Sequence, residues 1–220
     1  MSPQTESRAR PGSPAAAWDD MVRGNARFVA GTPLHPRQDV ERRAELADGQ
    51  APTAALFGCS DSRLSAEIIF DKGLGDLFVI RNAGQIASES VIGSLEYAVA
   101  VLQVPLIVVL SHDSCGAVKA AIDSQTAEPP TLPPHIVSLI SRIIPAVHEV
   151  GGAGAVDAQT IDAGQVGLHH LRGTIAAILE SSELISDAIA TGTLAIVGAN
   201  YALEEGVVRR HAVIGSLDAN

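Results

Sequence analysis

The chain has 220 residues, of which 46% are apolar and 18% charged, and its formal net charge is −10. A chain of this length can build one sizeable core, since such a domain buries about 70% of the surface of its unfolded form. The negative charge would repel nucleic acid and no Lys/Arg cluster offsets it, so we expect no nucleic-acid partner. No apolar run is long enough to span a bilayer, and the first residues lack a secretory signal, so we expect a cytoplasmic protein without a membrane partner.

The first part of the chain is expected to lie outside the main fold. Residues 1–14 are rich in Pro, Ser and Arg and are predicted to be disordered, which leaves residues 15–220 as a single domain. Helix-forming residues predict helices over 15–30 and 40–49. Because both precede the first core strand, we expect them to form an N-terminal helical arm.

The rest of the chain alternates strands and helices, which is typical of an α/β fold with a mostly parallel sheet flanked by helices. Buried apolar runs predict strands at 53–57, 76–80, 105–110 and 194–199, with helices at 65–70, 89–102, 115–123, 135–150 and 158–180. Four prolines in residues 127–134 predict a loop, and another apolar run covers 207–214. We find no internal repeat and no second domain.

Two polar motifs directly follow buried strands of this sheet. Cys59, Asp61 and Arg63 follow the first strand, and His112 and Cys115 follow the strand at 105–110. Because the carboxyl ends of parallel strands share one edge, both motifs should open on that edge. Two thiolates and one imidazole suit Zn²⁺, and three protein ligands leave one position free, which is the arrangement of a catalytic zinc site.

Asp61 and Arg63 supply polar groups that such a site needs. The Asp61 carboxylate can accept a hydrogen bond from a metal-bound water or fill the open position itself, and Arg63 can hold it as a bidentate partner. Taken singly, each residue has a plainer explanation: a cysteine can fill a core, His112 can be a satisfied loop histidine, and Asp61 can cap a helix. Their combination after two neighbouring strands favours the zinc site.

The motifs CSDSR at 59–63 and HDSC at 112–115 resemble the hallmarks of the β-class carbonic anhydrases. The surrounding text, including ALFGCSDSRL, DLFVIRNAG and SLEYAVAVLQVPLIVVLSHDSCGAV, extends the resemblance from about Trp18 to Tyr201. It implies zinc-dependent reversible hydration of CO2 to bicarbonate and a proton, with zinc-bound hydroxide as the nucleophile. It also implies that Cys59, His112 and Cys115 are the zinc ligands, and that Asp61 and Arg63 form the catalytic dyad.

The resemblance further implies a substrate pocket and an assembly. Gln50 matches a glutamine that donates to the substrate oxygen, Phe78 and Tyr97 match apolar positions reached partly across a subunit interface, and Gly116 is assigned to substrate binding. The plainer alternatives are that Gln50 is a solvated amide at a helix end and that Phe78 and Tyr97 are core aromatics. The family implies a homodimer or homotetramer whose N-terminal helices wrap the partner, with four parallel strands extended by a fifth.

Members of the family differ in whether the aspartate binds zinc at low pH, with bicarbonate held in a noncatalytic pocket. Arg81 and Tyr201 match two residues of that pocket, but Leu56 stands where its tryptophan would be, so the sequence predicts the type whose zinc stays open. His169 and His170 are candidate proton shuttles by residue type, but both are expected on a helix surface.

Three other functions were weighed against this interpretation. Hydrolysis of a CO2 analogue, such as carbon disulfide or carbonyl sulfide, would use the same metal site with altered access. A noncatalytic zinc or redox-sensing protein would not need Asp61, Arg63 and Gln50 together. Nucleotide binding is disfavoured because no G-x-G-x-x-G motif follows the first strand.

Overall fold

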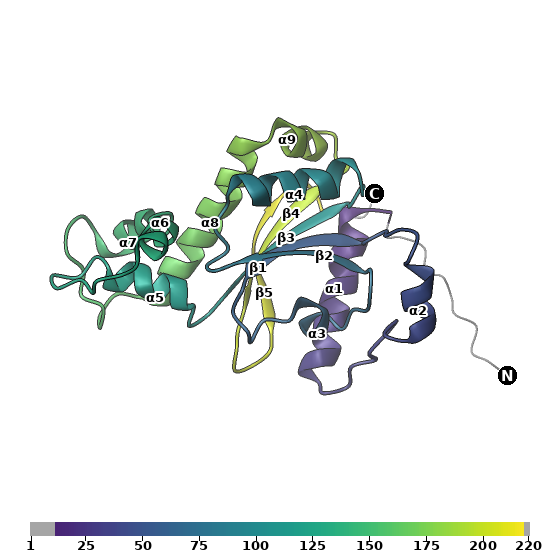
Figure 1. Cartoon of the computed structure of the whole chain (residues 1–220), viewed down its shortest axis with the longest axis horizontal. Coiled ribbons are helices and arrows are strands. Elements are labelled where there is room, and N and C mark those ends of the chain that lie inside the picture. The colour runs from purple at the N-terminus through teal and green to yellow at the C-terminus, as the bar shows by residue number, and fades with distance from the viewer. Residues whose placement is uncertain (1–11, 218–220) are drawn as a thin grey trace.

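A computed structural model describes residues 12–217, which form one α/β domain around a five-stranded sheet (Figure 1). The strands are β1 (Ala54–Cys59), β2 (Leu77–Asn82), β3 (Leu106–His112), β4 (Ala195–Tyr201) and β5 (Val208–Ile214). Their order in the sheet is β2-β1-β3-β4-β5. The first four are parallel and β5 pairs antiparallel with β4. The predicted fold, four parallel strands with a fifth strand at the edge, is confirmed.

Helices cover both faces of the sheet, which is why its central strands are apolar at nearly every position. One face is covered by α4 (Glu89–Ala100), α8 (Ala163–Ser181) and α9 (Glu183–Ala190), and it receives the side chains of Phe57, Ile107 and Val109. The other face receives those of Leu56 and Val108. It is covered by α1 (Pro14–Val29), α3 (Ala66–Ile69) and α5 (Gly116–Asp123).

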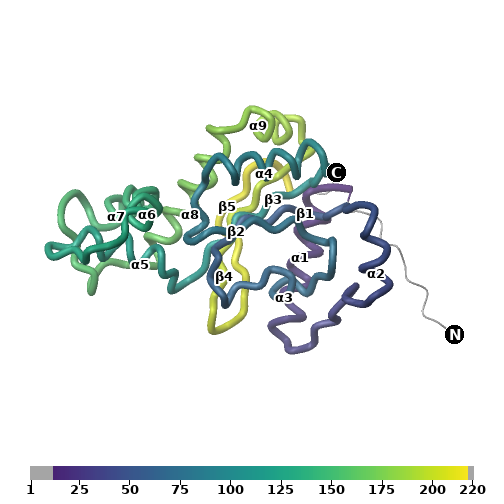
Figure 2. Tube along the Cα trace, in the orientation of Figure 1, coloured from purple at the N-terminus to yellow at the C-terminus, as the bar shows by residue number. Residues whose placement is uncertain are grey.

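The remaining helices lie at the two ends of the molecule. The tube view shows α6 (Pro134–Ile140) and α7 (Ile144–Gly151) gathered with α5 at one end, and α2 (Val40–Glu45) beyond α1 and α3 at the other (Figure 2). Helix α2 buries none of its residues. Within the described residues, no helix has the length and apolar character needed to cross a membrane.

Helix α1 packs against the sheet of its own chain. Ser13 caps its first turn, Pro14 begins it, and Trp18 and Met21 enter the core. The Asn25 side chain donates to the carbonyls of Ile69 and Gly206 at 3.1 and 2.8 Å. Of the helical arm, only α2 and the loops beside it therefore lie outside the core. The predicted disordered segment 1–14 falls outside the described residues, except for residues 12–14.

The first four strands extend two residues beyond their predicted carboxyl ends. The sequence placed these ends at residues 57, 80, 110 and 199, because polar residues or a break in the apolar run follow. Backbone pairing nevertheless continues, for example between Cys59 and Asn82 and between His112 and Tyr201. Cys59 and His112 therefore occupy the last residues of two strands, and only Cys115 belongs to a turn.

The helical boundaries differ more from those predicted. The single helix expected at 135–150 is two helices, α6 and α7, because Pro145 lacks the N–H that an uninterrupted helix requires and stands in the first turn of α7. Helix α8 begins at Ala163, where the Asp162 carboxylate accepts a hydrogen bond from the Gln165 N–H. Helix α9 was not predicted. The Ser182 hydroxyl caps it by accepting from the Ile185 N–H.

Candidate metal centre

Three side chains that can bind a metal meet at the carboxyl edge of the sheet. Cys59 ends β1, His112 ends β3, and Cys115 is the residue before the first turn of α5. Their sulfur and nitrogen atoms all lie within 4.8 Å of one another, and all three residues are buried. A tetrahedral ion bound at about 2.0–2.3 Å holds its ligand atoms roughly 3.5–4 Å apart, so this cluster is already close to the spacing that Zn²⁺ requires.

The hydrogen bonding of His112 leaves one ring nitrogen available to a metal. His112 Nδ1 lies 2.8 Å from the Asp113 carbonyl oxygen, which can only accept, so Nδ1 carries the proton and Nε2 the lone pair. Nε2 is buried and has no hydrogen-bond partner. A buried polar atom without a partner is costly, and binding a cation would remove that cost. The three side chains therefore fit a zinc ion.

Both cysteines are buried, and neither forms a disulfide. The contact with the Cys115 thiol lowers the pKa of Cys59 against the opposing effect of burial, and His112 and the backbone N–H of Gly84 lower it further. The same contact, together with burial, raises the pKa of Cys115. A divalent cation bound between the two cysteines would stabilise both groups as thiolates.

Asp61 and Arg63 form a bidentate pair beside this cluster. Arg63 Nε donates to Asp61 Oδ1 at 2.9 Å and Nη2 donates to Oδ2 at 2.6 Å. The Arg63 hydrogen bond holds the pKa of Asp61 well below its usual range. Asp61 Oδ2 lies 3.9 Å from His112 Nε2, and Arg63 Nη2 also donates to the Ser114 carbonyl at 3.3 Å. The pair therefore places an ionised carboxylate next to the ligand cluster and links the two loops.

Arg81 has a role at the site that the sequence did not reveal. Its Nε donates to the Cys59 carbonyl at 2.9 Å and its Nη2 to the Asp61 carbonyl at 2.6 Å, so it holds the backbone of the first loop. Tyr201 and Leu56, the other two positions compared with the noncatalytic bicarbonate pocket, are both buried. The guanidinium of Arg81 thus donates to the main chain of the candidate site.

The two adjacent histidines of α8 occupy different environments. His169 Nδ1 lies 2.5 Å from Glu149 Oε2 and its side chain is partly exposed, in agreement with the expectation of a helix surface. His170 is only 4% exposed, so that expectation is wrong for His170. It lies four residues from both Val166 and Thr174, which are also buried. Residues four positions apart lie on one face of a helix, so this spacing in the sequence could have indicated that His170 is buried.

The proposed substrate residues divide into two groups. Gly116, the first residue of α5, lines a cavity of about 680 Å³ together with His112, Cys115, Arg209 and His211. A Cβ added to Gly116 would meet no atom within 4 Å, so its backbone is open to a small ligand.

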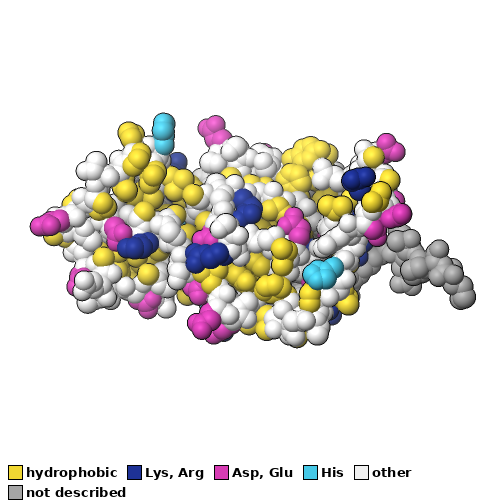
Figure 3. Space-filling model, turned by 60° about the horizontal axis from the view of Figure 1, so that its bottom comes forward, with side chains coloured by type: hydrophobic (Ala, Val, Ile, Leu, Met, Phe, Trp, Pro, Cys, Tyr) yellow, Lys and Arg dark blue, Asp and Glu magenta, His cyan; other side chains and the backbone are white. Residues whose placement is uncertain are grey.

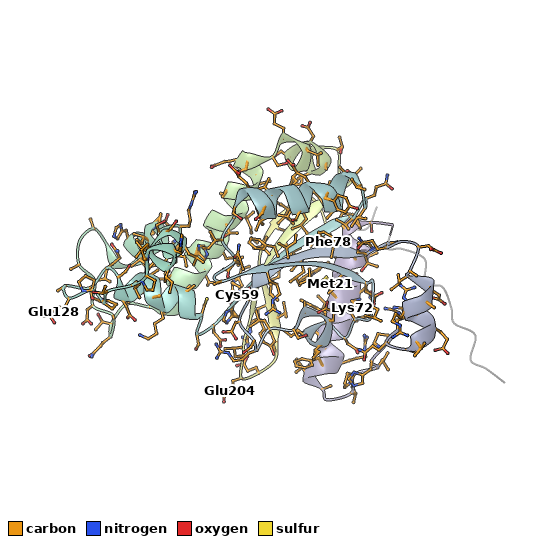
Figure 4. All side chains as sticks on the ribbon, viewed as in Figure 1. Met21, Cys59, Lys72, Phe78, Glu128 and Glu204 are labelled. Carbon is orange, nitrogen blue, oxygen red and sulfur yellow. The ribbon has the colours of Figure 1, made fainter. Side chains whose placement is uncertain are left out.

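Gln50, Phe78 and Tyr97 lie elsewhere. Gln50 is exposed and precedes β1, at the opposite end of the strand from Cys59. Phe78 pairs in register with Ala55, and its ring centroid lies 6.0 Å from that of Tyr97. Since β1 spans roughly 17 Å at 3.3 Å per residue, these side chains lie far along the sheet from the ligand cluster. Figure 4 shows the separation between Cys59 and Phe78.

Comparisons with known proteins agree on one family. The model of the carbonic anhydrase family matches residues 54–208. Carbonic anhydrase 2 of Mycobacterium tuberculosis is 49% identical over 204 residues, which cover 90% of this chain and 94% of that protein. A carbonic anhydrase of Mycolicibacterium smegmatis is 46% identical over 206 residues, covering 93% and 97% of the two chains.

Solved structures give the same result. A Coccomyxa β-carbonic anhydrase in complex with acetazolamide superimposes with a TM-score of 0.65 and 26% identity, covering 78% of each chain. One of two tetrameric β-carbonic anhydrases from Sordaria macrospora gives a TM-score of 0.63 and 27% identity, covering 76% of this chain and 84% of that chain. From its sequence and its fold, the chain belongs to the β-class carbonic anhydrases.

Proposed function

We propose that this protein is a zinc enzyme that hydrates CO2 reversibly to bicarbonate and a proton. The observation that carries the proposal is the buried cluster of Cys59, His112 and Cys115 with the Asp61–Arg63 pair directly beside it. A site that only stored a metal would not need an ionised carboxylate held next to the ligands by a bidentate arginine.

Cys59 Sγ, Cys115 Sγ and His112 Nε2 would hold the ion and leave a fourth position open. Zn²⁺, when bound, supplies a Lewis acid that lowers the pKa of water and so provides a nucleophile near neutral pH. Two thiolate ligands must stay reduced, which fits the cytoplasm, the location that we propose and that cell fractionation would test.

Asp61 would orient the attacking water by accepting a hydrogen bond from it. Because Arg63 holds both carboxylate oxygens, Asp61 stays ionised and cannot turn freely toward the metal. We therefore propose that this enzyme keeps its fourth metal position open to water. A crystal structure at low pH with the Asp61 carboxylate on the metal would contradict this. The Gly116 N–H would contact an oxygen of the substrate at the start of α5.

A second copy of the chain would supply the remaining pocket residues, because Gln50, Phe78 and Tyr97 cannot reach the metal cluster of their own chain. Large exposed apolar side chains on α1, α2, α3 and the loops beside these helices support an interface on this part of the molecule: Val22, Val29, Leu34, Val40, Ile68 and Leu74. Figure 3 shows apolar side chains exposed among the charged ones on one face. We propose a homodimer or homotetramer. A monomer in sedimentation experiments with full activity would contradict it.

The decisive experiment is stopped-flow CO2 hydration from about pH 6.5 to 9, measured beside the zinc content and a chelator-treated control. About one zinc per chain and metal-dependent hydration that rises with pH are expected. Full zinc content without hydration would overturn the proposal. Turnover of carbon disulfide or carbonyl sulfide would then indicate an analogue hydrolase, and no turnover would indicate a noncatalytic zinc protein.

A further inference from the structure

A loop between β2 and α4 connects the buried face of α8 to one of the candidate metal ligands. The Gly84 N–H donates to Cys59 Sγ, with the nitrogen and sulfur 3.3 Å apart. On the other side of the same residue, His170 Nε2 lies 2.7 Å from the Gly84 carbonyl oxygen. A continuous hydrogen-bonded path therefore runs from α8 through Gly84 to the metal cluster.

Gly84 needs an external anchor because its own backbone is permissive. Its φ is +77°, a region that favours glycine, and an added Cβ would lie 2.8 Å from the Cβ of Ala117. Asn82 fixes the ends of the loop by donating to the Ile86 carbonyl and accepting from the Ile86 N–H. The Gln85 N–H, which shares a peptide group with the Gly84 carbonyl, donates to the Asn82 carbonyl at 3.4 Å, and the bond from His170 to the Gly84 carbonyl holds the same peptide group from the α8 side.

His170 is suited to be that anchor. The Gly84 carbonyl can only accept, so His170 Nε2 carries a proton and donates. Burial lowers the pKa of His170, which keeps the imidazole neutral at neutral pH and fixes this tautomer. One turn further along α8, the Thr174 hydroxyl donates to the next carbonyl of the loop, that of Gln85, at 3.3 Å.

We propose that His170 is a positioning residue for the metal centre: by holding the Gly84 carbonyl, it keeps the Gly84 N–H directed at Cys59 Sγ. The N–H bond withdraws charge from the thiolate and fixes its orientation, and groups that act on a metal ligand in this way tune metal affinity. This inference rests on the proposed role of Cys59 as a metal ligand.

The test compares three variants in the Co²⁺-loaded and Zn²⁺-loaded proteins. His170→Leu removes the donor and keeps an apolar side chain. His170→Gln restores an N–H donor at nearly the position of Nε2. Thr174→Val is the matched control, since it removes the neighbouring hydrogen bond to the same loop from the same helix face. The two readouts are the thiolate-to-cobalt charge-transfer band and the rate at which a chelator removes zinc.

For His170→Leu we expect the charge-transfer band to move to lower energy and zinc loss to accelerate about tenfold, the lower end of the range for groups that support a metal ligand. His170→Gln should restore both values, and Thr174→Val should leave both near wild type. If folded His170→Leu matches wild type, if His170→Gln behaves like His170→Leu, or if Thr174→Val gives an equal shift, the proposal is wrong.

A measurement on the unaltered chain keeps the proposal testable if His170→Leu does not fold. In protein loaded with a spin-½ isotope of Cd²⁺, NMR should detect a scalar coupling between the metal and the Gly84 amide proton through Cys59. Absence of that coupling, in a sample whose thiolate absorption shows bound Cd²⁺, would overturn the proposal. Failure of the proposed function gives a different result: no thiolate-to-metal band in the wild type, or a normal band without CO2 hydration.

Discussion

The two ends of strand β1 differ in how completely one chain organises them. At the carboxyl end, Cys59 accepts from the Gly84 N–H, its carbonyl accepts from Arg81, and Asp61 is held by Arg63. At the amino end, Gln50 is exposed on a loop outside the core. One chain thus brings the candidate metal ligands and the Asp61–Arg63 pair together by itself, whereas Gln50 lies apart from them and would need a neighbouring copy to act on substrate.

The largest effect should come from removing a metal ligand at the carboxyl end. Cys115→Ala leaves one thiolate and one imidazole, so zinc affinity should fall by more than the roughly 100-fold that the loss of a supporting residue can cost. Zinc per chain after dialysis should drop to a small fraction, and CO2 hydration should disappear with it. Ser111→Ala is the control, because Ser111 is buried beside His112 but bonds only to the Ala199 carbonyl and Asn200. Full zinc content in Cys115→Ala would rule out the assigned ligand set.

The next largest effect, also at the carboxyl end of β1, should lower the rate of the reaction without affecting metal binding. Asp61→Asn removes the charge that orients the attacking water and places an amide against Arg63, so kcat should fall about 100- to 10,000-fold while zinc content stays normal. Asp48→Asn changes an exposed carboxylate near Gln50 and should leave kcat unchanged. Stopped-flow kinetics with zinc analysis checks both variants. A fully active Asp61→Asn enzyme would show that the Asp61–Arg63 pair is structural.

A smaller effect is expected at the amino end. Gln50→Ala should keep its zinc and its stability but lose about tenfold in rate, the equivalent of one hydrogen bond to substrate. Co-refolding it with Cys59→Ala chains should raise activity above the sum of the separate proteins. In such a hybrid, the intact metal cluster of one chain meets the intact Gln50 of the other. A mixture with no gain would show that Gln50 does not act across an interface.

The same contrast explains what could be predicted from the sequence. Continuous apolar strands indicated the parallel sheet, and the shared edge of parallel strands predicted that Cys59, His112 and Cys115 would meet, as they do. The roles of Arg81 and His170 could not be predicted in this way, because both act on backbone carbonyls whose positions exist only in the folded chain. The break between α6 and α7 was missed although Pro145 marked it.

The smallest effect, on stability, should come from Asp71, which secures the loop between α1 and α2. This buried carboxylate accepts from the N–H groups of Leu34 and His35 and from Arg27 Nε. Burial alone would raise the pKa of Asp71, but these donors lower it overall. The folded state therefore binds a proton at Asp71 less readily than the unfolded state does. The resulting stabilisation is complete above the ordinary Asp pKa of about 4 and is lost as the pH falls through the lower folded-state value.

Asp71→Asn should consequently lower the free energy of unfolding by about 1–3 kcal/mol at neutral pH, with zinc content unchanged. The difference in the free energy of unfolding between Asp71→Asn and wild type should narrow as the pH falls below about 4, because protonation then removes the charge of the wild-type carboxylate. Urea unfolding of the zinc-free proteins at both pH values measures this without interference from metal loss. Asp39→Asn, an exposed change in the same segment that keeps a side-chain oxygen able to cap α2, should cost less at neutral pH. A difference between Asp71→Asn and wild type that is independent of pH would mean that the Asp71 charge does not secure this loop.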